Sequence, residues 1–149
     1  MKIAVASDHG GFKLKNRIKE YLLSIGCEVY DFGTDSTDSC DYPDYALPAA
    51  EAVASGKCDR GIIICTTGVG VSIVANKVPG VRCALCQDKY CAEFTRRHNN
   101  ANVLALGAKV VKEDKALKLI DIFLNTEFEG GRHQQRVDKI TAVEKKYSK

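Results

Sequence analysis

The sequence has no long hydrophobic run, no internal repeat and no low-complexity segment. Its first hydrophobic stretch starts at Ile3 and ends at Asp8 and two glycines, so it is too short for a signal-peptide core and far too short to cross a bilayer. The 149 residues also contain no segment with the composition of a linker. These absences predict a single domain over residues 1–149, with no membrane partner.

A strong excess of charge of one sign is missing as well. Lysine and arginine total 22 against 19 aspartates and glutamates, which gives a net charge of +3 at pH 7. No basic block and no run of basic residues interleaved with aromatics accompanies this small excess, so we expect no nucleic-acid partner. The positive charge suits a small anionic ligand instead.

Regularly spaced cysteine pairs are also absent. The seven cysteines are an odd number with scattered spacing, which predicts free thiols in a reducing cytoplasm rather than a disulfide framework. Cys83, Cys86 and Cys91 have a Cys-x2-Cys-x4-Cys spacing, but Cys83 falls inside an apolar stretch and no second pair completes a ligand set. A structural zinc site is therefore disfavoured, and we expect no metal.

What the chain does have is a regular alternation of short apolar runs and amphipathic segments. The runs predict strands, and the segments with apolar residues on one face predict helices. We expect strands over residues 2–7, 28–32, 60–65, 81–86 and 103–106, and helices over residues 12–25, 43–56, 70–77, 88–97, 112–125 and from 130 onwards. This order predicts an α/β fold with a five-stranded, mostly parallel sheet flanked by helices.

Chemically active side chains gather where the predicted strands end or begin. Asp8 and His9 come directly after the first strand, Cys65 ends the third, and His98 and Asn99 precede the fifth. Ligands of open parallel sheets bind outside the carboxyl ends of the strands. We therefore look for the site among these residues.

Cys65 stands before a loop that carries glycines and opens a helix. Backbone N–H groups and the positive end of the helix dipole favour a thiolate at such a place. A thiolate there can remove a proton from carbon while the loop amides hold the resulting oxyanion. The same pattern also fits a buried structural cysteine followed by a tight turn, because the loop has neither the P-loop ending nor a full dinucleotide fingerprint. The loop residues are Thr66, Thr67, Gly68, Val69 and Gly70.

Three polar residues have both a chemical and a structural interpretation. His98 can deliver a proton to a substrate oxygen, although histidine is also favoured at a helix C-terminus. Asn99 can donate a hydrogen bond to a developing oxyanion. Asp8 can orient His9 or contact a hydroxylated ligand, and it can also cap the helix that follows.

Arg132 and Arg136 are four residues apart and so lie on one face of the predicted last helix. Such a pair is either solvated surface or, if it converges with His9, a clamp for a phosphate.

Together these segments resemble the ribose-5-phosphate isomerase B family, which also includes subunits of galactose-6-phosphate isomerase and allose-6-phosphate isomerases. The matching stretches occur in the family's order and span nearly the whole chain. They are residues 7–11, 41–44, 65–77, 98–107 and 129–137. A match over all five stretches is much more specific than any single motif.

The resemblance implies a Rossmann-like domain whose C-terminal helix lies at a dimer interface, in a homodimer or a tetramer with each active site built from both subunits. The activity it implies is an aldose–ketose isomerisation between D-ribose 5-phosphate and D-ribulose 5-phosphate. The reaction passes through an enediol in the cytoplasm and uses no cofactor, because the proton only moves between adjacent carbons.

Residue roles follow from the same resemblance. Cys65 is implied as the base that moves the proton, Thr67 as its hydroxyl partner, His98 as the group that opens the furanose ring, and Asn99 as a support for the intermediate. The substrate-binding roles fall on the loop at the enediolate (Thr66, Gly68, Val69 and Gly70), on a phosphate grip (His9, Arg132 and Arg136) and on further substrate contacts (Asp8, Tyr42 and Lys109).

Two positions depart from the family pattern. Thr66 stands where the family usually has glycine, and a positive φ there would strain a threonine. Lys109 stands where many relatives have arginine, which removes the option of a bidentate contact. Neither change removes a catalytic group.

Other functions are compatible with parts of the pattern. A six-carbon sugar phosphate, such as allose 6-phosphate or galactose 6-phosphate, is the nearest alternative substrate. A non-catalytic phosphosugar-binding module would need the phosphate grip but neither Cys65 nor His98. A cysteine-based redox sensor is a third alternative.

Overall fold

The computed structural model describes residues 1–149 and has one sheet of five strands in the order β2-β1-β3-β5-β4. All four neighbouring pairs are parallel. The strands are β1 (Lys2–Ser7), β2 (Glu28–Asp31), β3 (Arg60–Cys65), β4 (Cys83–Leu85) and β5 (Val103–Gly107). The predicted α/β fold with a five-stranded parallel sheet is confirmed.

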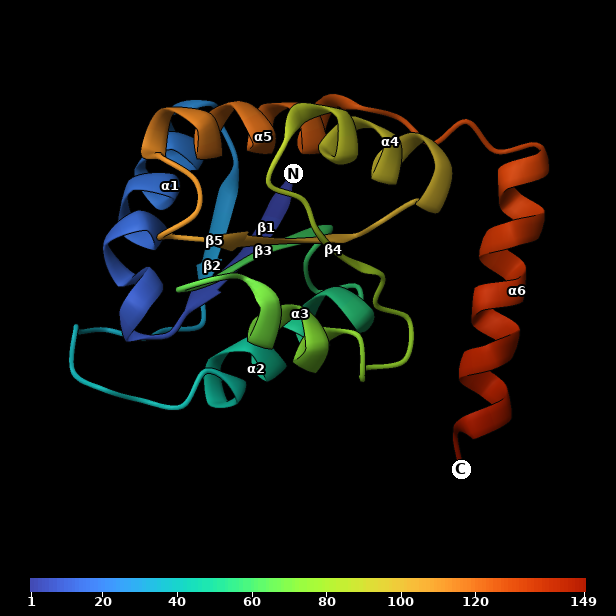
Figure 1. The fold of residues 1–149 in the computed structure, drawn as a ribbon, viewed down its shortest axis with the longest axis horizontal. Helices are drawn as coiled ribbons and strands as arrows, with labels where there is room; N and C mark the ends of the chain where they lie inside the picture. Colours follow the sequence, from blue (N-terminus) through green and yellow to red (C-terminus); the bar gives the residue numbers. More distant parts are fainter.

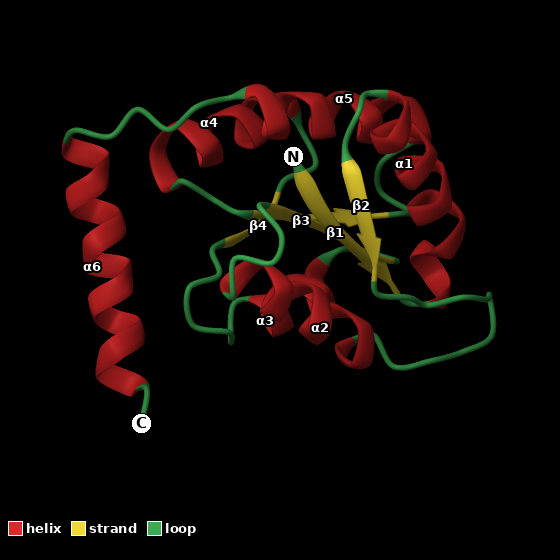
Figure 2. Ribbon diagram, turned by 180° about the vertical axis from the view of Figure 1, so that it is seen from behind, coloured by secondary structure: helices red, strands yellow, loops and turns green.

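Helices cover both faces of this sheet. In Figures 1 and 2, α1, α4 and α5 lie on one face, and α2 and α3 lie on the other. The helices are α1 (Phe12–Ser24), α2 (Pro43–Ala54), α3 (Val69–Ala75), α4 (Lys89–Asn99), α5 (Glu113–Asn125) and α6 (Arg132–Tyr147), and a short 3-10 turn, η1, spans His9–Gly11.

Each face of the sheet has its own hydrophobic core. Side chains alternate along a strand, so Ile62 and Ile64 of β3 pack under α1, α4 and α5, whereas Ile63 and Cys65 pack against α2 and α3. The central strands are buried on both sides, which explains why β3 reads as a continuous apolar run.

Several boundaries differ by one or two residues from the sequence-based prediction, and two of these differences have a clear physical reason. The fourth strand is Cys83–Leu85 rather than residues 81–86, because β4 is an edge strand that pairs only with β5. Helix α4 extends to Asn99 rather than to Arg97, and Asn100 ends it in the left-handed conformation with φ 47°. Asparagine tolerates this conformation better than most residues, which makes it a suitable C-cap.

The loop between β2 and α2 is anchored by a buried lysine. Lys15 of α1 is 1% exposed, and its Nζ donates to Asp31 Oδ1 at 2.8 Å and to the Thr34 carbonyl at 2.6 Å. Lys19 binds the other oxygen of Asp31 at 3.1 Å. This network fixes the start of the loop that leads to Cys40 and Tyr42.

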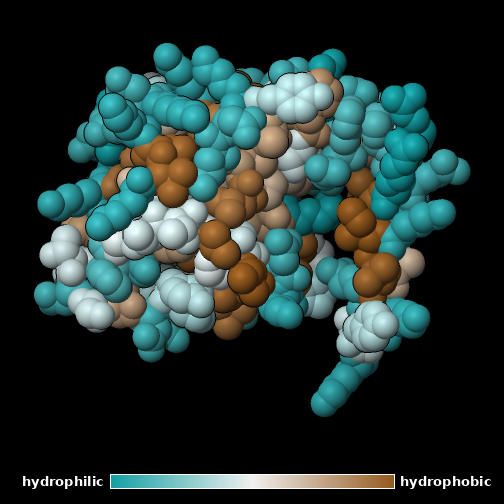
Figure 3. Space-filling view, in the orientation of Figure 1, coloured by the Kyte–Doolittle hydropathy of each residue, from teal (hydrophilic) through white to brown (hydrophobic).

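Helix α6 stands beside the rest of the molecule (Figure 1), and the Gly80 N–H donates to Glu144 Oε1 near its end at 2.9 Å. Only His133 and Val137 of its residues are buried, whereas Ile140 and Val143 are exposed. Figure 3 shows hydrophobic side chains on the side of α6 that faces the body. A helix with an exposed apolar stripe needs a partner surface to cover it.

None of the helices has the length and apolar character needed to cross a membrane.

Candidate active site

Cys65 lies at the carboxyl end of β3 and is 6% exposed. Its Sγ accepts a hydrogen bond at 3.1 Å from the N–H of Gly68 in the loop that follows. Gly68 has φ +80°, and a Cβ there would lie 2.8 Å from the Leu106 carbonyl carbon, so the position requires glycine. The sulfur is therefore held against a backbone donor. Helix α3, which starts at Val69, is only seven residues long, so the local amide matters more than a helix dipole.

The turn after β1 lies against this loop. Asp8 caps η1, since its Oδ1 accepts from the N–H groups of Gly10 at 3.0 Å and Gly11 at 3.2 Å. A Cβ on Gly10 would collide with Thr66 Oγ1, so the two loops approach closely at the carboxyl end of the sheet. Asp8 is therefore a cap, as one interpretation of the sequence expected, but of the 3-10 turn rather than of α1, whose N-cap is Gly11. Its Oδ2 accepts no hydrogen bond within the chain.

Tyr42 joins the same group from the start of α2. A Cβ on Gly70 would lie 2.7 Å from Cζ of the Tyr42 ring, so the ring packs directly on the loop after Cys65. Thr67 is exposed beside it, and its Oγ1 accepts from the Val69 N–H at 3.2 Å. Asp8, Tyr42, Cys65 and its loop are therefore brought together in one chain.

His9 is oriented by the loop between β2 and α2. The backbone N–H of Cys40 donates to His9 Nδ1 at 3.2 Å, so a proton on the neutral ring sits on Nε2. Nε2 has no partner within the chain, which leaves it free to donate to an anion.

The two departures from the family pattern prove compatible with the loop. Thr66 does not have a positive φ, since Asn100 is the one non-glycine residue that does, so threonine is unstrained there. The Thr66 carbonyl accepts from the Lys109 N–H at 3.0 Å, and the Cys65 carbonyl accepts from the Ala108 N–H at 2.9 Å. The exposed Lys109 thus supports the loop through its backbone.

Gln87 is a supporting residue that the sequence analysis missed. Its Oε1 accepts from the Gly107 N–H at 3.0 Å, and its Nε2 lies 3.4 Å from the Thr67 carbonyl. It bridges the loop after β3 to the end of β5. Its position just after β4, at the carboxyl ends of the strands, is the signal by which the sequence could have identified it.

A second group of candidate residues lies elsewhere. His98 and Asn99 end α4, and Arg132 and Arg136 begin α6. The ring of His98 stacks on His133 with centroids 3.9 Å apart and an interplanar angle of 8°.

One chain does not bring the two groups together. Cys65 pairs with Gly107 at the carboxyl end of β5, whereas His98 and Asn99 precede Val103, where β5 starts. The length of β5, five residues, places its amino and carboxyl ends about 13 Å apart. Figures 1 and 2 both place α6 at the far side of the molecule from the carboxyl ends of β1 and β3. His9 therefore does not converge with Arg132 and Arg136 within one chain.

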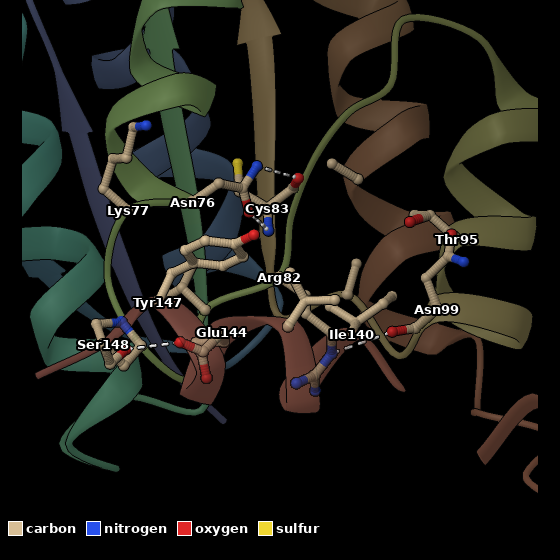
Figure 4. A pocket seen from close by; sticks show the side chains of 15 residues that line it. Asn76, Lys77, Arg82, Cys83, Thr95, Asn99, Ile140, Glu144, Tyr147 and Ser148 are labelled. Atoms are coloured by element: carbon tan, nitrogen blue, oxygen red, sulfur yellow. Dashed lines mark hydrogen bonds between the residues drawn. The ribbon is translucent and has the colours of Figure 1, made fainter. Parts of the chain in front are cut away.

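Two cavities lie beside the second group of candidate residues. A groove of about 780 Å³ separates α6 from the body and is lined by Arg82, Asn99, Ile140 and Tyr147 among others (Figure 4). A smaller cavity of about 390 Å³ runs along α4 beside Phe94 and His98. Neither cavity includes Cys65 or the arginines of α6.

Groups that could hold a metal are few. Donor atoms of His98, Glu129 and His133 lie within 4.8 Å of one another and form the one such cluster in the chain. The two rings are parallel, so their nitrogen lone pairs do not converge on one point as ligands of a metal do. Burial raises the pKa of the Cys83 thiol and raises that of Cys86 to about 12, which disfavours thiolate ligands there.

Comparison with known proteins gives consistent matches. The model of the ribose/galactose isomerase family matches residues 3–140. The chain is 50% identical over 145 residues to ribose-5-phosphate isomerase B of Escherichia coli (strain K12), with 97% of each chain covered. It resembles the structure of Clostridium thermocellum ribose-5-phosphate isomerase B with a TM-score of 0.98 and 57% identity, over 99% of this chain and 100% of that one. The Mycoplasma genitalium ribose-5-phosphate isomerase B with bound ribulose-5-phosphate gives a TM-score of 0.93 and 46% identity, over 97% and 96% of the two chains.

Proposed function

The chain belongs to the ribose/galactose isomerase family, and on this basis we propose that it interconverts D-ribose 5-phosphate and D-ribulose 5-phosphate, with the whole chain acting as one isomerase domain. The solved relatives named above support this substrate, one of them with ribulose-5-phosphate bound. The seven free thiols fit the reducing cytoplasm as the place where it works.

The observation that carries the proposal is the hydrogen bond from the Gly68 N–H to Cys65 Sγ at 3.1 Å. A backbone donor aimed at sulfur stabilises the thiolate, which is the form that accepts a proton. In the proposed reaction Cys65 takes the proton from C2 of the open aldose and returns it to C1, while the hydroxyl proton of O2 is transferred to O1. The other amides of the loop, those of Thr67 and Gly70, hold the enediolate oxygen, and donors of this kind are worth about 3–4 kcal/mol each.

The remaining residues take the binding and ring-opening roles. Asp8 and Tyr42 line the sugar beside Cys65, and His9 donates to the phosphate through Nε2. His98 opens the furanose ring, Asn99 donates to the intermediate, and Arg132 and Arg136 hold the phosphate through their guanidinium groups.

Because these groups lie on opposite sides of one chain, we infer that the working form is a homodimer with sites shared between subunits. The carboxyl edge with Cys65 on one subunit would face the ends of α4 and α6 on its partner. The exposed apolar stripe of α6 and the groove beside it supply surface for such an interface.

Replacing Cys65 by alanine tests the base directly. We expect turnover of ribose 5-phosphate to fall at least about a thousandfold while the variant still binds the sugar. The matched control is Cys58→Ala, which removes a thiol that is 2% exposed in the same core and should lower stability but not turnover. Near-wild-type turnover by Cys65→Ala would reject Cys65 as the base.

Mixing two inactive variants tests the shared site. Chains with Cys65→Ala and chains with His98→Asn are refolded together so that they exchange. A heterodimer then has one intact site, so about a quarter of wild-type activity should return. A mixture that stays inactive, although mixed dimers form, would show that each site is built within one chain.

Two assays separate the alternatives. Turnover on allose 6-phosphate, compared with ribose 5-phosphate, tests the six-carbon substrate. Exchange of the C2 hydrogen of ribose 5-phosphate with deuterated solvent tests catalysis itself, because a module that only binds phosphosugars leaves that hydrogen in place. Both assays are run with a chelator and without nucleotide.

A further inference from the structure

The loop before α6 and the first turn of α6 carry two titratable residues, Glu129 and His133, that the proposed reaction does not use. His133 is 6% exposed although the residues around it on α6 are exposed, and its ring stacks on that of His98. Glu129 lies beside both rings, with Oε1 at 3.5 Å from His133 Nε2 and at 3.9 Å from His98 Nε2. The two histidines therefore face one carboxylate.

Glu129 is held in this position from the other side. Its Oε2 binds Arg97 Nε at 2.8 Å, and its backbone N–H donates to the Arg97 carbonyl at 3.1 Å. Arg97 is itself fixed by Glu93 at 3.0 Å and by the ring of Phe94, whose centroid lies 5.3 Å from its guanidinium carbon. The carboxylate cannot turn away without breaking the Arg97 contacts.

His98 contacts two aromatic rings. Phe94 meets it in a T-shaped contact with centroids 5.0 Å apart, and His133 covers it in parallel at 3.9 Å. These contacts restrict the ring of a side chain that is still 35% exposed. Its orientation is thus set by neighbours rather than by a hydrogen bond of its own.

The surroundings of His133 disfavour a charge on its ring. Burial lowers the pKa of His133 below its usual 6.5, the charges of His98 and Arg132 lower it further, and Arg136 adds to this, while Glu129 opposes the change. His133 therefore stays neutral near neutral pH. The charged groups around the pair are Glu129, Arg97, Arg132 and Arg136, and Glu129 is the single carboxylate among them.

We propose that Glu129 and His133 are positioning residues for His98: the stacked ring of His133 fixes the plane of the His98 ring, and Glu129, anchored by Arg97, holds the two rings in place. This inference rests on the proposed role of His98 in opening the furanose ring. It assigns to the segment 129–133 a function in the first step of the reaction, separate from the phosphate grip of Arg132 and Arg136.

The chemistry of the two sugars separates this first step from the proton transfer at carbon. Ribose 5-phosphate closes a furanose through O4 and C1, so it must be opened. Ribulose 5-phosphate has its carbonyl at C2 and its O5 bound to phosphate, so it cannot close a five-membered ring and enters already open. Exchange of its C1 hydrogen with deuterated solvent therefore reports Cys65 chemistry without ring opening.

The experiment measures both reactions in Glu129→Gln and His133→Ala. We expect turnover of ribose 5-phosphate to fall about tenfold in each, while exchange at C1 of ribulose 5-phosphate stays within about twofold of wild type. His133→Phe keeps a flat ring and should restore most of the turnover. Glu127→Gln, which removes an exposed carboxylate without a partner in the same loop, should leave both rates unchanged.

Three outcomes would overturn the inference. Equal loss of both rates would mean that the two residues serve only the fold or the interface, and no loss would mean that His98 does not need them. A His133→Phe variant as slow as His133→Ala would reject the stacking role. If the wild-type protein performs neither reaction, the proposed function itself fails, which is a separate result.

Discussion

Lys15 is a residue whose role no pattern in the sequence indicates, because its neighbours at Leu14 and Ile18 mark only the apolar face of α1. The structure explains its burial by two partners, Asp31 and the Thr34 carbonyl. Burial by itself raises the pKa of Asp31, but hydrogen bonds from Lys15, the Gly33 amide and Lys19 outweigh it and lower that pKa below its usual 3.8. A buried lysine thus holds the loop that orients His9 and Tyr42.

Replacing Lys15 by methionine is expected to destabilise the protein by about 2 kcal/mol, because Asp31 loses its buried partner but keeps some contact with water. The matched control is Lys19→Met, which removes the exposed partner of the same carboxylate and should cost less than about 1 kcal/mol. Urea unfolding measures both. Since folding lowers the pKa of Asp31, its ionised carboxylate stabilises the fold above pH 3.8, and this stabilisation is lost as the pH falls through the lowered value. The difference in unfolding free energy between wild type and Lys15→Met should therefore shrink in acid. Equal costs for the two variants would contradict this account.

Among the elements, the loop between β3 and α3 has the strictest geometry. Gly68→Ala places a Cβ at a residue with φ +80°, 2.8 Å from the Leu106 carbonyl carbon, and moves the amide that donates to Cys65. We expect turnover to fall about a hundredfold, because displacements of about 1 Å at a reacting group have effects of this size. Gly56→Ala is the control: its φ is +82° and its Cβ would meet nothing within 4 Å, so it should lower stability by about 1 kcal/mol and leave turnover unchanged. Comparable losses of turnover in both variants would mean that backbone strain alone, rather than the position of the amide, matters.

The order of elements could be predicted from periodicity because buried strands and amphipathic helices alternate without interruption. The boundaries were less accessible, since the length of β4 depends on having one neighbour and the end of α4 depends on the left-handed conformation of Asn100. Cys65 and its loop could be named from their place after β3. Gln87 was missed because its role depends on contacts with two other strand ends.

For the molecule as a whole, α6 is separable from the fold. Neither hydrophobic core contains a residue of α6. A chain that ends at Thr126 should therefore still unfold cooperatively, while it loses the helical signal of the 16 residues of α6, the proposed dimer and all activity. Circular dichroism and sedimentation equilibrium measure these properties. A truncated chain that still dimerises would place the interface elsewhere.

The sequence alone could not show that the candidate residues divide into two groups. Distance along the chain does not reveal that His98 precedes the start of β5 while Cys65 ends the parallel neighbour β3. Only the sheet order and register show that Cys65 and His98 lie at opposite ends of the strands. The prediction of a site shared between subunits came from the family resemblance, and the proposed homodimer rests on the separation of the two groups within one chain.

The separation of Cys65 from His98 and the α6 arginines also has a consequence for gene duplication. If two copies of this gene arose, one could lose the thiol and the other the imidazole without ending catalysis, as long as the products paired with each other. Each copy would then be useless alone, and selection would preserve both. A split of this kind turns a self-pairing protein into an obligate two-gene enzyme through the loss of residues, with no new contact required.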